Sequence, residues 1–262
     1  MPTALITGAS GGIGAAFATE LAKRQHNLIL VARSEAKLQQ LAATLQQQFK
    51  VRVEAIVQDL SAPGAGTAVF DTVVKKGWTV DLLVNNAGFG DYGAFADRPL
   101  GKQLTMVQLN IVALVELSHL FLQGMRERKS GSIINVASLA AFQPMPYLST
   151  YAATKAFVLS FSEALWAENK DLGIGVLCLC PGPTESDFAA VAEFPKALAS
   201  SSGLKLVPAA EVVRDALKAL DQNESNVVTG GIPNQILANI PRLIPRELLV
   251  QSVGNLFRAK DE

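Results

Sequence analysis

Ser138, Tyr151 and Lys155 have the types and the spacing that proton transfer requires. Ser138 closes the apolar run 132–137, which predicts a buried strand. Tyr151 and Lys155 follow two prolines on a helical pattern, and their spacing of four puts the phenol and the ammonium on one helix face. The three residues together predict a proton-donating site that needs a hydride source. The alternative is that Tyr151 and Lys155 are an ordinary surface pair on an amphipathic helix. The rest of the chain must decide between a catalytic pair and a surface pair.

Apolar runs alternate with helical patterns along the whole chain, which indicates an α/β protein with a parallel sheet and helices on both faces. The expected strands are 4–7, 28–31, 51–57, 82–84, 132–137, 174–180 and 227–228. The expected helices are 12–24, 35–48, 65–76, one within 99–127, 149–169 and 209–220. Because no repeat or linker interrupts the pattern, we expect residues 1–262 to form a single domain, with an apolar C-terminal extension over 230–262.

The composition excludes several classes of function. The 262 residues are 49% hydrophobic, and 23 basic residues balance 23 acidic ones, so no basic excess points to nucleic acid. Two histidines are too few for a three-histidine zinc site within one chain, and we expect no metal. Cys178 and Cys180 are expected on one face of a strand, as small core residues. With neither a signal peptide nor an apolar run approaching the ~18 residues of a membrane span, we expect a cytoplasmic protein.

A glycine-rich turn separates the first expected strand from the first expected helix. Glycines at such a place let the backbone turn tightly and approach a pyrophosphate, while the start of the helix offers free N–H groups to the anion. A plain flexible turn is the alternative, but the position within a βα unit favours dinucleotide binding. The expected binding residues of the turn are Thr7, Gly8, Ser10, Gly11, Gly12, Ile13 and Gly14.

The residues after the second expected strand favour NADP over NAD. Folds that prefer NAD usually carry an acid about 20 residues after the glycines, where it binds the ribose 2′-hydroxyl. Here Arg33 lies 19 residues after Gly14 and could bind a 2′-phosphate. Glu35 is close in count, and we interpret it as an acid at a helix start, where the helix dipole stabilises it. A solvated surface charge is the alternative reading of Arg33.

Taken in order, these motifs resemble those of the short-chain dehydrogenase/reductase family, over nearly all of residues 3–190. The matching positions are Thr7, Gly8, Gly12 and Gly14 in the glycine motif, Asp59 and Leu60 after the third strand, Asn85, Asn86, Ala87 and Gly88 after the fourth, Asn110, Ser138, Tyr151, Lys155, and Pro181 with Gly182 after the sixth. The resemblance implies a Rossmann-type doubly wound sheet of about seven strands in the order 3-2-1-4-5-6-7.

The resemblance also implies the role of each candidate catalytic residue. Tyr151 would be the general acid when a carbonyl is reduced. Lys155 and the positive nicotinamide ring of the oxidised cofactor would both lower the pKa of Tyr151 from about 10 toward neutrality, and Lys155 would also bind the nicotinamide ribose. Ser138 would hold the substrate oxygen, and Asn110 would hold a water that links Lys155 to solvent. Further expected contacts of the cofactor are Asp59, Leu60, Asn86, Ala87, Gly88, Pro181 and Gly182.

Some positions depart from the family pattern. The hydroxyls of Thr184 and Ser186 could both contact the carboxamide of the cofactor, and the sequence does not rank them. The basic residue that NADP-preferring members often carry before the second glycine is Gly11 here, so Arg33 would act alone. The Val-Ala-Arg turn and the Asn-Asn-Ala-Gly-Phe-Gly segment are similar to those of a bacterial subgroup of NADP-preferring reductases.

Three segments that should converge beyond the strand ends are rich in apolar side chains, which predicts an apolar carbonyl substrate. The expected pocket residues are Phe89, Leu139, Phe142, Met145 and Phe188, with Tyr92, Phe95 and Tyr147 nearby. Neither the segment after Ser138 nor 89–95 contains an arginine or lysine to hold an anion, and Asp91 would repel one. Arg242 and Arg246 are the next candidates for an anion clamp.

Alternatives to a carbonyl reductase remain. One is a catalytically silent cofactor sensor or scaffold, although such proteins usually lose the tyrosine or the lysine. Another is a lipid reductase at a membrane surface, because the extension 230–262 is apolar and broken by prolines. That extension could equally cover the active site or another subunit. The family commonly forms dimers or tetramers through two long helices, which here carry Leu109, Val112, Leu114, Val115, Leu117, Phe157, Phe161 and Trp166.

Overall fold

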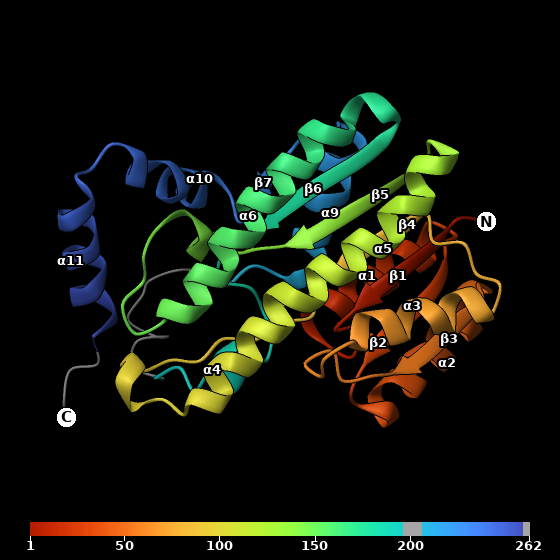
Figure 1. The fold of residues 1–262 in the computed structure, drawn as a ribbon, viewed down its shortest axis with the longest axis horizontal. Helices are drawn as coiled ribbons and strands as arrows, with labels where there is room; N and C mark the ends of the chain where they lie inside the picture. Colours follow the sequence, from red (N-terminus) through yellow and green to blue (C-terminus); the bar gives the residue numbers. More distant parts are fainter. Residues whose placement is uncertain (196–205, 259–262) are drawn as a thin grey trace.

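A computed structural model describes residues 1–195 and 206–258. Its seven parallel strands form one sheet in the order β3-β2-β1-β4-β5-β6-β7, which confirms the expected topology (Figure 1). The strands are β1 Thr3–Thr7, β2 Asn27–Ala32, β3 Val53–Val57, β4 Leu82–Asn85, β5 Gly131–Val136, β6 Ile174–Cys180 and β7 Asn226–Val228. The chain order reverses between β1 and β4, so their carboxyl ends form the crevice where this class of fold binds ligands.

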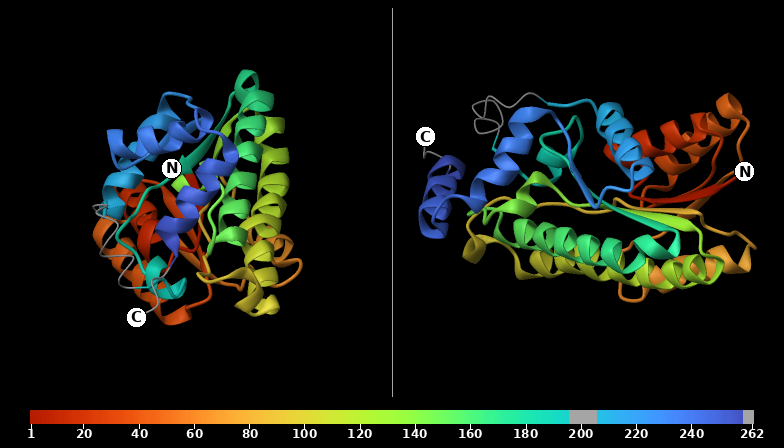
Figure 2. Two further views of the ribbon diagram at one scale, coloured as in Figure 1. Left: turned by 90° about the vertical axis from the view of Figure 1, so that its left-hand side faces the viewer. Right: turned by 90° about the horizontal axis from the view of Figure 1, so that it is seen from above.

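Two layers of helices cover the sheet (Figure 2). One face packs on α1 Gly12–Lys23, α2 Glu35–Phe49 and α9 Ala209–Asp221. The other packs on α3 Ala65–Lys75, α5 Ala113–Arg128 and α6 Ser149–Asn169. Shorter helices are η1 Phe95–Asp97, α4 Leu100–Val107, η3 Leu139–Phe142, η4 Lys170–Leu172 and α7 Phe188–Val191.

Two expected elements differ from the structure by more than one residue at a boundary. The helix expected within 99–127 is divided into α4 and α5 by a π-helical turn, η2 Gln108–Val112, which widens the helix at Asn110. The third strand begins at Val53 instead of residue 51, because Val53 is the first residue in register with β2, opposite Leu28. Neither change alters the order of the elements.

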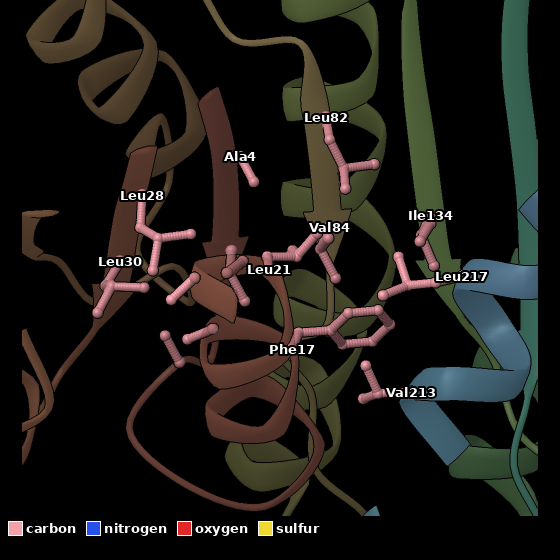
Figure 3. Close-up of a cluster of buried hydrophobic side chains, with 14 of the residues drawn as sticks. Ala4, Phe17, Leu21, Leu28, Leu30, Leu82, Val84, Ile134, Val213 and Leu217 are labelled. Atoms are coloured by element: carbon pink, nitrogen blue, oxygen red, sulfur yellow. The ribbon is translucent and has the colours of Figure 1, made fainter. Parts of the chain in front are cut away.

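The core has two halves because successive strand residues point to opposite faces of the sheet. Leu28 and Leu30 face α1 and α2, whereas Ile29 and Val31 face the opposite layer, and all four are fully buried. Figure 3 shows the first half, where the ring of Phe17 from α1 lies between the strands and α9. The packing of both faces fixes the strand ends that carry the site.

The stretch Leu100–Arg128 is the one part of the described chain that is long and apolar enough to cross a membrane by length and composition alone. Its α5 half packs on the sheet through Leu117, Phe121 and Met125, which are buried. These contacts attach α5 to the sheet, and composition by itself is weak evidence for a span.

The C-terminal extension projects beyond the sheet (Figures 1 and 2). It consists of α10 Ile232–Asn239, a short turn η5 Ile240–Arg242 and α11 Arg246–Phe257. The last residues of the extension, 259–262, lie outside the described part of the chain. A turn that contains Pro241 and Pro245 joins α10 to α11, and the two helices with this turn are called the C-terminal hairpin.

Phe17→Ala should lower the free energy of unfolding by about 3–5 kcal/mol, because the ring is fully buried and its removal leaves a cavity. Phe95→Ala is the matched control, since that ring is 60% exposed and its loss should cost no more than about 0.5 kcal/mol. Urea unfolding followed by circular dichroism measures both. Equal losses for the two variants would contradict this account of the core.

Candidate active site

The structure brings Ser138, Tyr151 and Lys155 together at the carboxyl end of β5. Ser138 precedes η3, and its Oγ accepts a hydrogen bond from Ala140 N (3.1 Å) while also bonding the Tyr151 hydroxyl. Lys155 Nζ donates to the carbonyl oxygen of Val136 at 2.7 Å and lies 5.8 Å from the centre of the Tyr151 ring. The expected juxtaposition of hydroxyl, phenol and cation is therefore present.

Burial controls the ionisation of this group. It raises the pKa of Tyr151 to about 12, and the hydrogen bond with Ser138 offsets only part of that effect. Burial likewise lowers the pKa of Lys155 to about 8. Among the chain's own groups, desolvation thus outweighs the hydrogen bond from Ser138. The expected lowering of the Tyr151 pKa toward neutrality includes the charge of the oxidised cofactor, and it stays a prediction. The neutral phenol is the form that donates a proton.

Asn110 lies on the π-helical turn, 1% exposed, and ties three elements together. Its Nδ2 donates to Phe89 O (3.0 Å) and to Thr154 Oγ1 (3.1 Å), and its Oδ1 accepts from Phe89 N (3.2 Å). A side-chain carbon on Gly88 would lie 2.9 Å from Asn110 Oδ1 and 3.5 Å from Lys155 Nζ. The Asn110 amide thus holds the loop after β4 against α6.

Thr7 and Asn86 bind the glycine turn to the end of β4. Thr7 Oγ1 accepts from the backbone N–H groups of Asn86 (2.9 Å) and Ala87 (3.0 Å). Asn86 Nδ2 donates to the carbonyl oxygens of Thr7 (2.9 Å) and Gly8 (3.2 Å). The two motifs recognised separately in the sequence therefore form one hydrogen-bonded unit.

The glycine turn fits a dinucleotide pyrophosphate. Gly8 and Gly12 have φ of 64° and 51°, and a side-chain carbon on Gly14 would lie 2.2 Å from Gly8 O. A carbon on Gly11 would meet nothing within 4 Å, and no described side chain caps the start of α1. Ser10 is half-buried on this turn, and Ile13 packs partly into the core. The open backbone and the uncapped helix start are what an anion requires.

Arg33 and Asp59 lie close enough to interact at the expected adenosine end of the crevice. Arg33 is exposed after β2, and its charge helps to hold the pKa of Asp59 below the ordinary value, although hydrogen bonds from Ser61 are the main cause. Glu35 begins α2, as expected of an acid at a helix start. Leu60 is 4% exposed and packs into the core beneath them.

The segment after Pro181 closes on the glycine turn. The carbonyl of Pro181 accepts from Leu139 N (2.8 Å), and a side-chain carbon on Gly12 would lie 3.2 Å from Ser186 Cβ. Thr184 Oγ1 bonds Gly182 O (2.9 Å), and Ser186 Oγ bonds Thr184 O (3.3 Å), so both hydroxyls are bound locally. Of these two residues, Ser186 is the one that lies against the glycine turn.

Asn234 is a buried residue of this region that the sequence analysis missed. Its Nδ2 donates to Thr229 O (2.8 Å), and it lies so close to Gly182 and Gly230 that either glycine's side-chain carbon would overlap it. The residue comes from α10, far from Gly182 in sequence. The only signal was an asparagine shortly after two glycines, Gly230 and Gly231, which is common in ordinary turns.

An apolar cluster surrounds the Tyr151 ring and contains most of the expected pocket residues. Met145, Phe89 and Phe188 belong to it, and the rings of Phe188 and Tyr151 are 5.1 Å apart. The remaining members are Tyr92, Met106, Ala140, Tyr147, Leu148, Ala152, Phe194, Leu249, Val253 and Phe257. Four of them lie beyond residue 190, which the sequence analysis left out of the pocket.

Phe142 lies elsewhere. It packs with Val158, Cys178 and Cys180 in a cluster between the sheet and α6, because η3 turns the chain so that this ring points to the layer of α6. Leu139 is half-buried on η3 outside that cluster, and Phe95 is 60% exposed. Cys178 and Cys180 are buried together with their sulfurs 3.7 Å apart, as expected of residues on one strand face.

Asp91 does not act as an exposed negative charge. Its side chain is fully buried and accepts hydrogen bonds from Arg98 Nε (2.8 Å) and Gln103 Nε2 (2.6 Å), with Lys102 Nζ at 2.6 Å. Although burial raises its pKa, the bonds from Arg98 and Lys102 outweigh that effect and hold the pKa below the ordinary value. The expectation that Asp91 repels an anion is wrong, because two cations neutralise it.

The same two cations hold the segment after Pro-Gly. Arg98 and Lys102 also bind Glu193, at 2.8 and 2.6 Å. Glu193 has φ of 55°, and the neighbouring carbonyl of Ala192 accepts from Tyr92 N at 2.8 Å. This ion cluster fixes the loop after β4 to the segment that carries Phe188.

The C-terminal hairpin covers the site from the outside. Leu249 and Val253 of α11 are each 7% exposed and pack in the cluster of Tyr151, and Phe257 O accepts from the Tyr92 hydroxyl at 2.7 Å. A side-chain carbon on Gly254 would lie 3.3 Å from Pro146. The sequence left open whether this extension covers the active site, another subunit or a membrane. The structure shows that its inner face covers the active site.

Comparison with known proteins places the chain among oxidoreductases. Residues 2–195 match the family model described as short chain dehydrogenase. A very-long-chain 3-oxoacyl-CoA reductase of Anas platyrhynchos is 39% identical over 186 residues, which is 68% of this chain and 58% of that protein. A 17-beta-hydroxysteroid dehydrogenase type 3 of Rattus norvegicus is 31% identical over 261 residues, 98% of this chain and 81% of that protein.

A solved structure is similar over the whole length. It is a short-chain dehydrogenase from Sphingobium yanoikuyae in complex with NADPH, with a TM-score of 0.83 and 30% identity, covering 100% of this chain and 98% of that one. The chain spans less than two thirds of the length of the Anas platyrhynchos reductase that it matches.

The ammonium of Lys155 should titrate near pH 8, well below its ordinary value of 10.5, because burial disfavours the charged form. Carbon-13 NMR of side-chain-labelled lysines measures this directly. The resonance that titrates near pH 8 should vanish in Lys155→Met, which assigns it. A wild-type spectrum in which every lysine titrates above pH 10 would contradict the described burial.

Proposed function

The chain belongs to the short-chain dehydrogenase/reductase family, and we propose that it reduces a large apolar ketone or aldehyde with NADPH, or oxidises the corresponding alcohol with NADP. The observation that carries the proposal is the buried triplet of Ser138, Tyr151 and Lys155 beside an open glycine turn. That arrangement unites a proton donor, an oxygen-binding hydroxyl and a place for a dinucleotide.

The chain's residues supply everything except the hydride, which the bound dinucleotide would provide. Ser138 Oγ and the Tyr151 hydroxyl would both donate to the carbonyl oxygen, so negative charge that develops there is stabilised as it forms. Tyr151 would then transfer its proton to that oxygen. Lys155 would stabilise the resulting phenolate in a site where burial strengthens the attraction between opposite charges.

The preference for NADPH rests on Arg33. Its exposed guanidinium follows β2, at the place where an acid would serve NAD, and no carboxylate of the described residues lies within ion-pairing distance of it. A 2′-phosphate bound there would gain a charge-assisted contact. The similar Sphingobium structure, which holds NADPH, supports this reading.

The proposed substrate is large and apolar around its carbonyl. The cluster around Tyr151 is aromatic and aliphatic, and the nearby cations Arg98 and Lys102 are already bound to Asp91 and Glu193. Relatives whose names specify a 3-oxoacyl-CoA or a hydroxysteroid act on bulky substrates of this kind, which supports the same class here.

The proposed assembly is a dimer or tetramer through α5 and α6. Phe157 on α6 is 40% exposed, and its ring stacks on Phe161 at 5.7 Å. Val112, the last residue of η2 just before α5, is 43% exposed. Leu114 and Leu117, by contrast, are buried in the core and are not free for pairing.

Tyr151→Phe should keep the ring packing while removing the proton donor, so turnover should fall 10²–10⁴-fold, roughly the range of general acid catalysis. NADPH binding measured by fluorescence should be retained, which separates chemistry from folding. The assay is NADPH oxidation with a panel of hydrophobic ketones. Turnover near that of the wild type would place the acid on another residue.

Arg33→Ala should weaken NADPH binding about tenfold to a hundredfold and leave NADH binding unchanged, because only the 2′-phosphate loses its partner. Isothermal titration of both cofactors against both proteins measures the change. Lys37→Ala, a neighbouring exposed charge on α2, is the control. Wild-type protein that binds NADH as tightly as NADPH would overturn the assignment of Arg33.

A further inference from the structure

The outer side of the C-terminal hairpin is unusually apolar for an exposed surface. Leu243 is 85% exposed, which places it at the extreme of the apolar residues in the described chain. We define the C-terminal apolar surface as the seven large apolar side chains of residues 232–257 that are at least 38% exposed: Ile232, Ile236, Leu237, Leu243, Ile244, Leu248 and Leu256. Exposed apolar residues gathered on one short segment mark an interaction site more often than chance exposure does.

The inner side of the same hairpin is buried against the rest of the protein. Ala238 is 1% exposed, and Leu249 and Val253 are each 7% exposed within the active-site cluster. Both helices are therefore packed on the protein, and the exposed apolar side chains are additional to those that hold them there. The hairpin packs one side on the protein and presents its other side outward, at the end of the molecule that projects beyond the sheet (Figures 1 and 2).

The charges of the hairpin have one dominant sign. Arg242 and Arg246 flank Leu243 and Ile244, and both are exposed. Among the described residues, no carboxylate lies within ion-pairing distance of either, unlike Arg98, which binds Asp91 and Glu193. Between residues 230 and 257, Glu247 is the one acidic residue in the sequence. Apolar side chains bordered by arginines are the composition that binds at an anionic lipid interface.

A second copy of the chain fits this surface less well. In a symmetric contact the surface meets itself, so two arginines from each subunit would have only Glu247 from each to pair with. Phe157 on α6 and Val112 at the end of η2, just before α5, offer a different place for a partner subunit.

We infer that the C-terminal apolar surface docks on a lipid bilayer that contains anionic headgroups. The proposed apolar substrate, which belongs to the proposed function, explains why docking would be useful. The docking itself depends only on the side chains of the hairpin. Because Leu249 and Val253 of α11 pack in the Tyr151 cluster while Leu248 of the same helix is 55% exposed, docking through Leu248 would bring the bilayer to within one helix of the site. An apolar carbonyl compound could then enter from lipid without crossing water.

The test measures flotation of the full-length protein with vesicles, in the absence of substrate. Vesicles of phosphatidylcholine with one third phosphatidylglycerol should carry the wild type upward, and pure phosphatidylcholine vesicles should carry much less. Ile236→Ser/Leu243→Ser/Leu248→Ser should reduce binding at least tenfold. Arg242→Gln/Arg246→Gln should remove most of the difference between the two lipid compositions.

Matched controls separate docking from misfolding and from the enzymatic proposal. Val57→Ser/Val74→Ser removes two side chains that are 46% and 56% exposed on β3 and α3, and it should bind vesicles as the wild type does. Each variant should keep its NADPH affinity and melting temperature. Since flotation needs no turnover, failure of the proposed reduction would leave this measurement intact, and failure of docking would leave turnover of a water-soluble ketone intact.

Three results would overturn the inference. One is a wild type that remains with the soluble fraction at both lipid compositions. A second is a triple serine variant that floats like the wild type. The third is a triple variant whose mass by light scattering falls from dimer to monomer while vesicle binding is unchanged, which would assign the surface to a second copy of the chain.

Discussion

The hydrogen bond from Lys155 Nζ to the carbonyl oxygen of Val136 is the contact on which the active site depends. It ties α6 to the end of β5 and gives a partner to an ammonium that is 5% exposed. A buried charge without such a partner would lose its proton, so this bond preserves what charge the site retains. Tyr151, one turn earlier on α6, is positioned by the same contact, and Ser138 follows two residues after Val136.

Buried amides extend this connection across the sheet. Asn85 Nδ2 at the end of β4 donates to Asn135 Oδ1 on β5 and to Ser118 Oγ on α5, each at 2.9 Å. Asn135 Nδ2 donates to Ser162 Oγ on α6 at 3.0 Å. Directional bonds of this kind specify one relative placement of the two helices, whereas apolar contacts tolerate several. The loop after β4, which bonds Asn110, therefore starts from a fixed point.

Hydrogen bonds and ion pairs also link the expected cofactor and substrate regions. Thr7 and Asn86 join the glycine turn to the loop after β4, while Arg98 and Lys102 join that loop to the segment carrying Phe188. The segment from Pro181 in turn reaches the glycine turn at Gly12 through Ser186. A ring of loops, joined by hydrogen bonds, ion pairs and close contacts, thus surrounds the crevice.

The sequence by itself determined the order of the strands and helices, the glycine turn, and the meeting of Ser138, Tyr151 and Lys155. These features depend on local periodicity and on the rule that carboxyl ends of parallel strands share one edge. Only the tertiary structure decided which way Phe142 points, that Asp91 is neutralised, and that Asn234 and α11 reach the site. Each of these depends on contacts between residues far apart in the chain. The pKa of Tyr151 belongs to the same group, because it is set by burial, which spacing along a sequence does not measure.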